Sequence, residues 1–191
     1  ISFLDKSNLL DLFTKLEMPL LKVLASMETN GTKINSEFLK NISIKYNNDL
    51  NKIEENIFKI SKERFNLASP KQLGEILFEK LKIKDNPKKT KTGQYSTSEE
   101  VLSQLSKENE IVSSILEWRS LQKLITTYVD ALPKQINKNT KRVHTVFNQA
   151  VASTGRLSSA NPNLQNIPIR TTRGKEIRKA FTCQNDNFKL L

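Results

Sequence analysis

The chain has 191 residues, of which 37% are hydrophobic, and its formal net charge is +11 at pH 7. No apolar run is long enough for a signal peptide or a membrane span, and the single cysteine, Cys183, excludes an internal disulfide and a multi-cysteine zinc site. We therefore expect a cytoplasmic protein that has no membrane partner and folds as one large domain or two small ones.

Helical periodicity begins near the start of the chain. Residues 8–29 are predicted to form a helix with a break or kink at Pro19, and Asn30-Gly31 provides the glycine that ends helices. A long helix then starts, capped by Asn35 or Ser36. Its apolar residues recur every three or four positions over about seven turns: Leu39, Ile42, Tyr46, Leu50, Ile53, Ile57 and Ile60. An apolar stripe of this length needs a second long helix to cover it.

We predict that the covering helix spans residues 108–132 and ends at Pro133. Its apolar residues show the same spacing: Ile111, Ile115, Trp118, Leu121, Ile125, Tyr128 and Leu132. The two helices are expected to pair antiparallel, so that the segment between them, about residues 66–105, forms a tip.

The tip has two helix-start signals on either side of a basic loop. Ser69-Pro70-Lys71-Gln72 has the pattern of a capping box, and the helix that it starts is expected to reach about Leu81. Residues 83–96 are basic and lack an apolar period, which is typical of a mobile loop, and Thr97 is predicted to start the next helix. Helix N-termini attract phosphate, so this tip could hold a duplex backbone without reading its sequence. Ordinary capping is the alternative for each helix start alone.

Residues 134–191 differ in charge from the rest of the chain. They contain 11 Lys/Arg against 2 Asp/Glu, whereas residues 1–133 contain 20 against 18. Such a one-signed surface favours a polyanionic partner over a merely solubilising role. Residues 136–151 are predicted to form strands or a hairpin with a turn at Asn139-Thr140, and a short helix is expected near 174–181. The final FKLL has the pattern of an apolar strand that begins there.

Within this basic region, residues 154–174 read TGRLSSANPNLQNIPIRTTRG. The stretch has three arginines, three asparagines and a glutamine but no acidic residue, and we expect it to be irregular. Such side chains suit phosphate oxygens, sugars and the acceptors of a minor groove. Alternatively, each asparagine closes a turn of its own loop, although that role does not account for the arginines.

The sequence contains no recognisable catalytic constellation. His144 has no paired acid or nucleophile nearby and is expected to be structural, and there is no Gly-rich phosphate loop, HExxH or GxSxG motif. Residues 134–191 have only Glu176 and Asp186 as carboxylates, too few and too far apart for a two-metal site. We therefore expect no catalytic residue and no bound metal or cofactor in this chain.

The stretch TGRLSSANPNLQNIPIRTTRGKEIRKAF resembles the segment that enters the palm of family A DNA polymerases, the bacterial DNA polymerase I type. Further similar pieces follow the family's order over nearly the whole chain: EMPLLKVLASMETNGTKIN, NLASPKQLGEILFEKL, YSTSEEVL, EWRSLQKLITTYVDALP and RVHTVFNQAVASTGRLSS. The resemblance implies a mainly α (α+β) fold. Residues 1–34 would lead into the palm and thumb base, residues 35–133 would form the thumb, and residues 134–191 would form a truncated palm with a short antiparallel β segment.

The resemblance also implies roles for single residues. Asn66, Ser69 and Lys123 match thumb residues that touch the DNA duplex. Arg156 matches the arginine that reaches the minor groove at the primer terminus, and Arg170 matches the one beside the incoming nucleotide. Asn163, Gln165 and Asn166 match positions that contact DNA, mainly the template strand.

The family's metal-binding aspartates would follow Leu191. We therefore expect an inactive fragment of a monomeric DNA-directed DNA polymerase, a nucleotidyltransferase of replication and repair. The parent would use primer-template DNA, dNTP and Mg²⁺. Two other functions remain open: a non-enzymatic nucleic-acid-binding module, and a helical adaptor whose long helix pair binds another protein.

Overall fold

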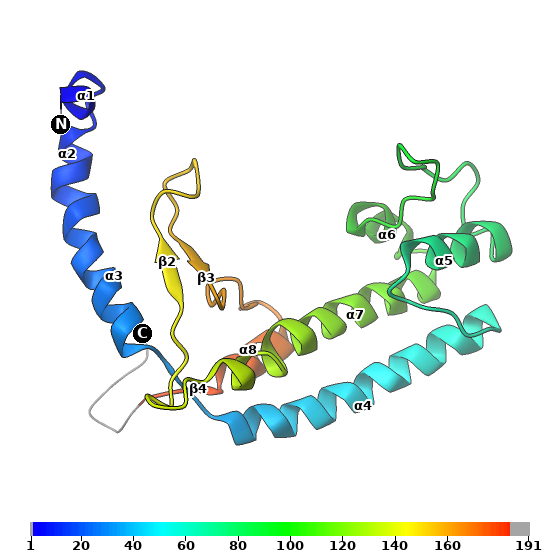
Figure 1. The fold of residues 1–191 in the computed structure, drawn as a ribbon. Helices are drawn as coiled ribbons and strands as arrows, with labels where there is room; N and C mark the ends of the chain where they lie inside the picture. The colour runs from blue at the N-terminus through cyan, green and yellow to red at the C-terminus, as the bar shows by residue number, and fades with distance from the viewer. Residues whose placement is uncertain (1, 184–191) are drawn as a thin grey trace. The chain divides into compact units, whose positions relative to one another are not determined.

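The computed structural model describes residues 2–183, in which helices predominate and strands are short (Figure 1). This confirms the expected mainly α fold. The chain divides into two compact units: residues 42–126, here called the helical unit, and residues 1–41 with 127–191, here called the strand-bearing unit. The predicted FKLL strand and Asp186 lie outside the described residues. No described helix is both long and apolar enough to cross a membrane.

Two long helices, α4 (Ser36–Ser61) and α7 (Glu110–Leu124), form the body of the helical unit. They run side by side in opposite directions (Figure 1), and the indole N–H of Trp118 donates to a Glu54 carboxylate oxygen across the pair at 3.4 Å. Asn35 caps α4, because its side-chain oxygen accepts the Phe38 N–H at 2.9 Å. The predicted stripes are buried, except that Ile53 and Ile60 of α4 are half-buried. The antiparallel helix pair is therefore confirmed.

The first tip helix, α5 (Pro70–Gly74), continues as the π-helical turn η2 (Glu75–Lys80). Ser69 caps it as predicted, accepting the Gln72 N–H at 3.4 Å. The reciprocal half of the capping box is wrong, because the Gln72 side chain accepts the N–H of Asn66 at 2.7 Å rather than that of Ser69.

The second tip helix is α6 (Glu99–Leu105), and its cap is Ser98 rather than the predicted Thr97. The Ser98 hydroxyl accepts the Val101 N–H at 3.4 Å. Thr97 is buried, and its carbonyl and hydroxyl oxygens accept from the Arg119 guanidinium at 2.5 and 3.3 Å. A contact with α7 thus excludes Thr97 from the capping position.

The basic segment between the tip helices folds back as a small hairpin. The Thr90 N–H donates to Gln94 O at 2.7 Å, and the Ser96 N–H donates to Lys88 O at 2.8 Å. Tyr95 anchors the returning arm through its ring, whose centroid lies 5.3 Å from that of Phe78. The predicted loop is present, but it has more internal pairing than its composition indicated.

The strand-bearing unit starts with α1 (Ser2–Lys6), α2 (Leu10–Leu12), the π-helical turn η1 (Phe13–Glu17) and α3 (Met18–Asn30). The helical path is not broken at Pro19, because the backbone stays helical from η1 through Glu17 into α3. The path changes from the π-helical turn to the α-helix at Met18, directly before the proline. Gly31 ends α3 as predicted, with φ 61° and ψ −174°, a region that is essentially restricted to glycine.

Two two-stranded antiparallel sheets complete the strand-bearing unit. One pairs β1 (Lys33–Ile34) with β4 (Phe181–Thr182), and the other pairs β2 (Val146–Asn148) with β3 (Ser158–Ala160). The turn near residues 139–140 is present and is closed by Asn137, whose side-chain oxygen accepts two N–H groups. The partner of 146–148, however, lies in the stretch that was expected to be irregular, so the prediction of a hairpin within residues 136–151 is corrected.

The remaining helical segments are short. The π-helical turn η3 (Ile125–Val129) extends α7 and is followed by the 3₁₀ turn η4 (Leu132–Gln135). The long helix therefore ends at Val129, three residues before the predicted end at Leu132, and Pro133 lies in the first turn of the separate 3₁₀ segment. The expected short helix is α8 (Thr172–Arg178), capped by Thr171, whose hydroxyl accepts the Gly174 N–H at 3.1 Å.

Candidate nucleic-acid interface

A groove of about 640 Å³ lies within the helical unit. The start of α5, the returning arm of the basic hairpin and one face of α7 border it, and its described lining residues include no Asp or Glu. Leu67 and Trp118 provide apolar surface, whereas Gln122 and Lys123 provide polar groups from α7. An acid-free groove with an apolar floor suits a polyanion that also has flat apolar surface.

Two cations of α7 differ in what they can do in this groove. Lys123 is exposed, and its ammonium has no hydrogen-bond or ion-pair partner within residues 2–183. Arg119 is half-buried and holds Thr97, and burial lowers its pKa while the nearby Glu99 carboxylate opposes that shift. Lys123 is therefore available to an external anion, whereas Arg119 supports the groove wall.

Asn66 and Ser69 flank the groove through their neighbours, since Leu67, Ala68 and Pro70 line it. The Asn66 side-chain oxygen accepts the Ala68 N–H at 2.9 Å, which leaves its amide nitrogen as a donor. The Ser69 hydroxyl caps α5. Lys123 thus lines the groove itself, whereas Asn66 and Ser69 are sequence neighbours of residues that line it.

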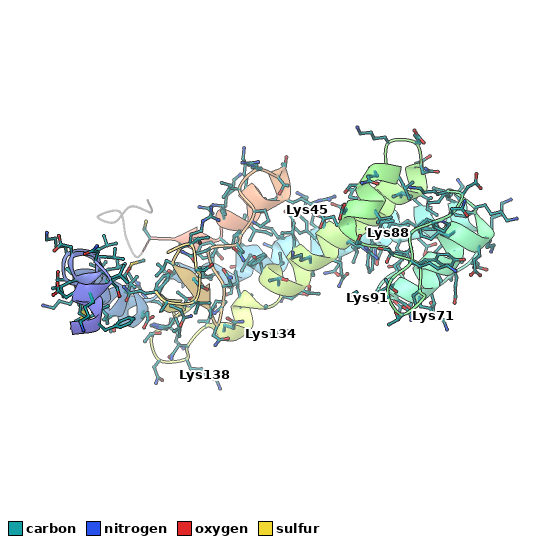
Figure 2. All side chains as sticks on the ribbon, turned by 90° about the horizontal axis from the view of Figure 1, so that it is seen from above. Lys45, Lys71, Lys88, Lys91, Lys134 and Lys138 are labelled. Carbon is teal, nitrogen blue, oxygen red and sulfur yellow. The ribbon has the colours of Figure 1, made fainter. Side chains whose placement is uncertain are left out.

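Lysines surround this tip. Figure 2 shows Lys71, Lys88 and Lys91 at the tip and Lys45 along the long helices. The Lys71 ammonium lies 4.0 Å from a Glu75 carboxylate oxygen, and the Lys89 ammonium lies 5.2 Å from the centroid of the Tyr95 ring. Sequence reasoning included the lysines of the loop but missed Arg119 and Trp118 as groove residues, because nothing local shows which face of α7 borders the tip.

The strand-bearing unit presents the other predicted residues. Arg156, Gln165, Asn166 and Arg170 are exposed, and their side chains have no partner within the part of the chain that the structure describes. Asn163 is half-buried, and its side-chain oxygen accepts the N–H groups of Gln165 and Asn166 at 3.1 and 3.2 Å. The turn-closing alternative therefore applies to the Asn163 oxygen but not to the two arginines.

A buried hydroxyl pair holds this polar segment in place. Thr145 and Ser159 are buried, with their hydroxyl oxygens 2.7 Å apart. Thr145 also donates to Pro162 O at 2.7 Å, and Ser159 accepts the Leu164 N–H at 3.0 Å. These contacts fix the backbone from which Gln165 projects. Neither hydroxyl was predicted from the sequence to be part of the site. For Thr145, the alternating pattern of the predicted strand that contains it could have indicated that its side chain is buried.

Gly174 allows the same segment to pack closely on α8. A Cβ at this position would lie 2.3 Å from Pro168 O, so only glycine fits. The backbone leading to Arg170 is thereby held against the start of the helix.

His144 has a structural environment. One ring nitrogen lies 2.7 Å from Glu28 O and the other lies 2.7 Å from the Thr140 hydroxyl oxygen. Both nitrogens are thus engaged within the fold, in agreement with the expected role. Residues 2–183 also contain no group of three or more His, Cys, Asp or Glu side chains that could hold a metal ion.

Comparisons with known proteins identify relatives over most of the chain. A family model described as DNA polymerase family A matches residues 36–191. DNA polymerase I of Synechocystis sp. is 50% identical over 180 residues, covering 94% of this chain and 18% of the relative. DNA polymerase I of Bacillus subtilis is 48% identical over 178 residues, covering 93% of this chain and 20% of the relative.

A solved structure is similar in fold as well. The POL domain of Pol1 from M. smegmatis, described as a complex with DNA primer-template and dNTP, matches with a TM-score of 0.82 and 37% identity. The match covers 93% of this chain and 31% of that chain. The chain spans about a fifth of the length of the curated relatives.

Proposed function

Because this chain belongs to DNA polymerase family A, as its sequence led us to expect, we propose that it is the duplex-binding segment of a DNA-directed DNA polymerase. The parent would act in template-directed nucleotidyl transfer during replication and repair. We assign residues 35–133, with the helix pair and its tip, to the thumb. Residues 134–191 would form the first part of the palm, and residues 1–34 would lead into it.

One observation carries this proposal. Arg156 and Arg170, in a segment without acidic residues, are exposed and have no partner within residues 2–183, in a chain whose structural relative is described with DNA primer-template and dNTP. Exposed fixed cations on a segment without acidic residues attract the phosphate groups of a nucleic acid.

The proposed contacts follow from the donors. Lys123, with Asn66 and Ser69 beside it, would bind the phosphate backbone of the duplex at the groove. Arg156 would reach the minor groove at the primer terminus, while Arg170 would bind the phosphates of the incoming nucleotide. Asn163, Gln165 and Asn166 would contact mainly the template strand, with Asn163 using its amide nitrogen because its oxygen is already engaged.

The donor set of residues 2–183 does not fit a two-metal site, since these residues contain no suitable group of carboxylates, histidines or cysteines. The Mg²⁺ ions of the parent would therefore be held by residues outside 2–183. The contribution of the described residues is to bind the duplex and to orient its end. The chain alone is expected to be inactive.

Fluorescence anisotropy with a labelled primer-template duplex tests the binding. We expect weak binding without sequence preference, which falls steeply as salt rises. Absence of salt-dependent binding would contradict the proposal and favour a protein-binding helical adaptor.

Primer extension tests the enzymatic part. We expect extension by the parent protein and none by the 191-residue chain. A parent that binds DNA but does not extend primers would instead be a non-enzymatic nucleic-acid-binding module.

A further inference from the structure

The hairpin of β2 and β3 carries Arg156 in its closing loop, residues 149–157. Regular pairing ends at Asn148 and Ser158, so Arg156 lies two residues beyond the last paired position. Its side chain has no partner within residues 2–183. The position of the guanidinium therefore depends on how the backbone of this loop is held.

Among the described residues, the loop makes its hydrogen bonds to the rest of the unit through one side chain, Gln149. Its amide nitrogen donates to the carboxylate of Glu17 at 2.6 Å and to the backbone carbonyl of the same residue at 3.1 Å. The turn between Gly155 and Ala152 is internal to the loop. The pair of Glu17 and Gln149 is thus the tie between the helix and the loop that carries Arg156.

The tie spans a groove that is open to solvent. The groove has a volume of about 350 Å³ and is lined by Phe13, Glu17, Met18 and Leu21 on the helical side and by Gln149 and Ala150 on the loop side. The two hydrogen bonds from Gln149 to Glu17 link these two sides.

The strand below the loop is fixed independently. A Glu28 carboxylate oxygen accepts the Phe147 N–H at 2.6 Å, on the edge of β2 that does not face β3, and His144 binds the Glu28 carbonyl. Loss of the Gln149 tie would therefore free the loop without detaching the strand. Such a local displacement acts on Arg156 and leaves the rest of the unit in place.

We propose that Glu17 and Gln149 are positioning residues for Arg156, holding its loop where the arginine can meet the primer terminus. This inference rests on the proposed function of Arg156. A displacement of about 1 Å at a reacting centre can cost on the order of a hundredfold in rate. Binding of the duplex elsewhere on the chain would hardly change.

A double-mutant cycle in the parent polymerase tests the proposal. The variants are Gln149→Leu, Arg156→Ala and their combination, with Glu17→Gln as the conservative control because its side-chain oxygen still accepts from Gln149. The measurements are the single-turnover rate of nucleotide incorporation, the affinity for primer-template DNA and the midpoint of thermal unfolding.

We expect Gln149→Leu to slow incorporation by about tenfold or more, with DNA affinity unchanged within about twofold. The double variant should be no slower than Arg156→Ala, because a residue that acts through Arg156 has no effect once the arginine is gone. Glu17→Gln should retain a rate within about threefold of the parent.

Other outcomes distinguish a failure of the positioning proposal from a failure of the proposed function. If Arg156→Ala slows incorporation but Gln149→Leu does not, the positioning proposal is wrong and the proposed function stands. If the two effects multiply in the double variant, or if Gln149→Leu lowers the unfolding midpoint and DNA affinity together, Gln149 supports the fold and the proposal is also wrong. If Arg156→Ala is without effect, the role of Arg156 fails, and the positioning proposal fails with it.

Discussion

Removal of two lysines from the basic hairpin should reduce the salt dependence of DNA binding. Lys88 and Lys91 are exposed, and neither has an ion-pair partner within residues 2–183. Their hairpin borders the groove, since Thr90 and Gln94 line it. If both ammonium groups neutralise phosphates, the variant Lys88→Ala with Lys91→Ala removes two counterion-releasing contacts.

The size of the effect follows from the number of contacts. Each phosphate contact contributes about −0.9 to the slope of log affinity against log salt, so two contacts contribute about −1.8. Between about 50 and 200 mM salt, a fourfold change, that difference corresponds to a factor of about 12 in affinity. Over this range, the fold-decrease in the affinity of the unaltered chain should therefore be about 12 times the fold-decrease measured for the variant.

The assay is anisotropy of a labelled duplex with the 191-residue chain at several salt concentrations. The matched control is Lys52→Ala with Lys59→Ala, which removes the same charge from exposed positions of α4 that do not line the groove. Equal slopes for the two double variants would refute the reasoning, because the effect would then come from net charge alone.

Three further predictions concern single residues. In the parent polymerase, Arg156→Ala should slow primer extension more than it weakens DNA affinity; an unchanged extension rate would count against its role at the primer terminus. Gly31→Ala should lower the free energy of unfolding by about 1–3 kcal/mol more than Gly155→Ala in urea titrations followed by circular dichroism. Both glycines have positive φ, but only the Cβ at residue 31 would approach other atoms, 2.7 Å from Val143 O. Burial raises the pKa of Tyr128. The neutral phenol therefore stabilises the fold up to about pH 10, this contribution is lost as pH rises further, and Tyr128→Phe should lessen the loss seen in unfolding titrations.

The long helices could be predicted because their stabilising interactions repeat along the sequence. Residues of the α4 stripe such as Tyr46 and Ile57 are buried at three- and four-residue spacing, and this period is visible without a structure. The residue that caps a helix is harder to predict from sequence than the helix itself. Thr97 and Ser98 are both competent caps, and the choice between them depends on Arg119, which lies 22 residues further along the chain and binds Thr97.

The strand Ser158–Ala160 could not be recognised from its own residues. Three small residues have no apolar alternation, and the buried Ser159 hydroxyl has Thr145, 14 residues away, among its partners. A polar segment is predicted as a loop when its partners are unknown, since an unsatisfied hydroxyl would be costly to bury.

For the candidate site, the chemical groups could be predicted from the sequence, but their placement could not. The identity of its donors follows from the sequence, because an acid-free run containing Arg156 and Arg170 is visible directly. Even the engagement of the Asn163 oxygen is local, since it accepts from residues two and three positions ahead. Placement of Arg156 is different: the tie from Gln149 to Glu17 joins residues 132 positions apart. Donor chemistry is therefore a property of a short segment, whereas the geometry that makes a donor useful depends on residues far away in the chain, which no local pattern can reveal.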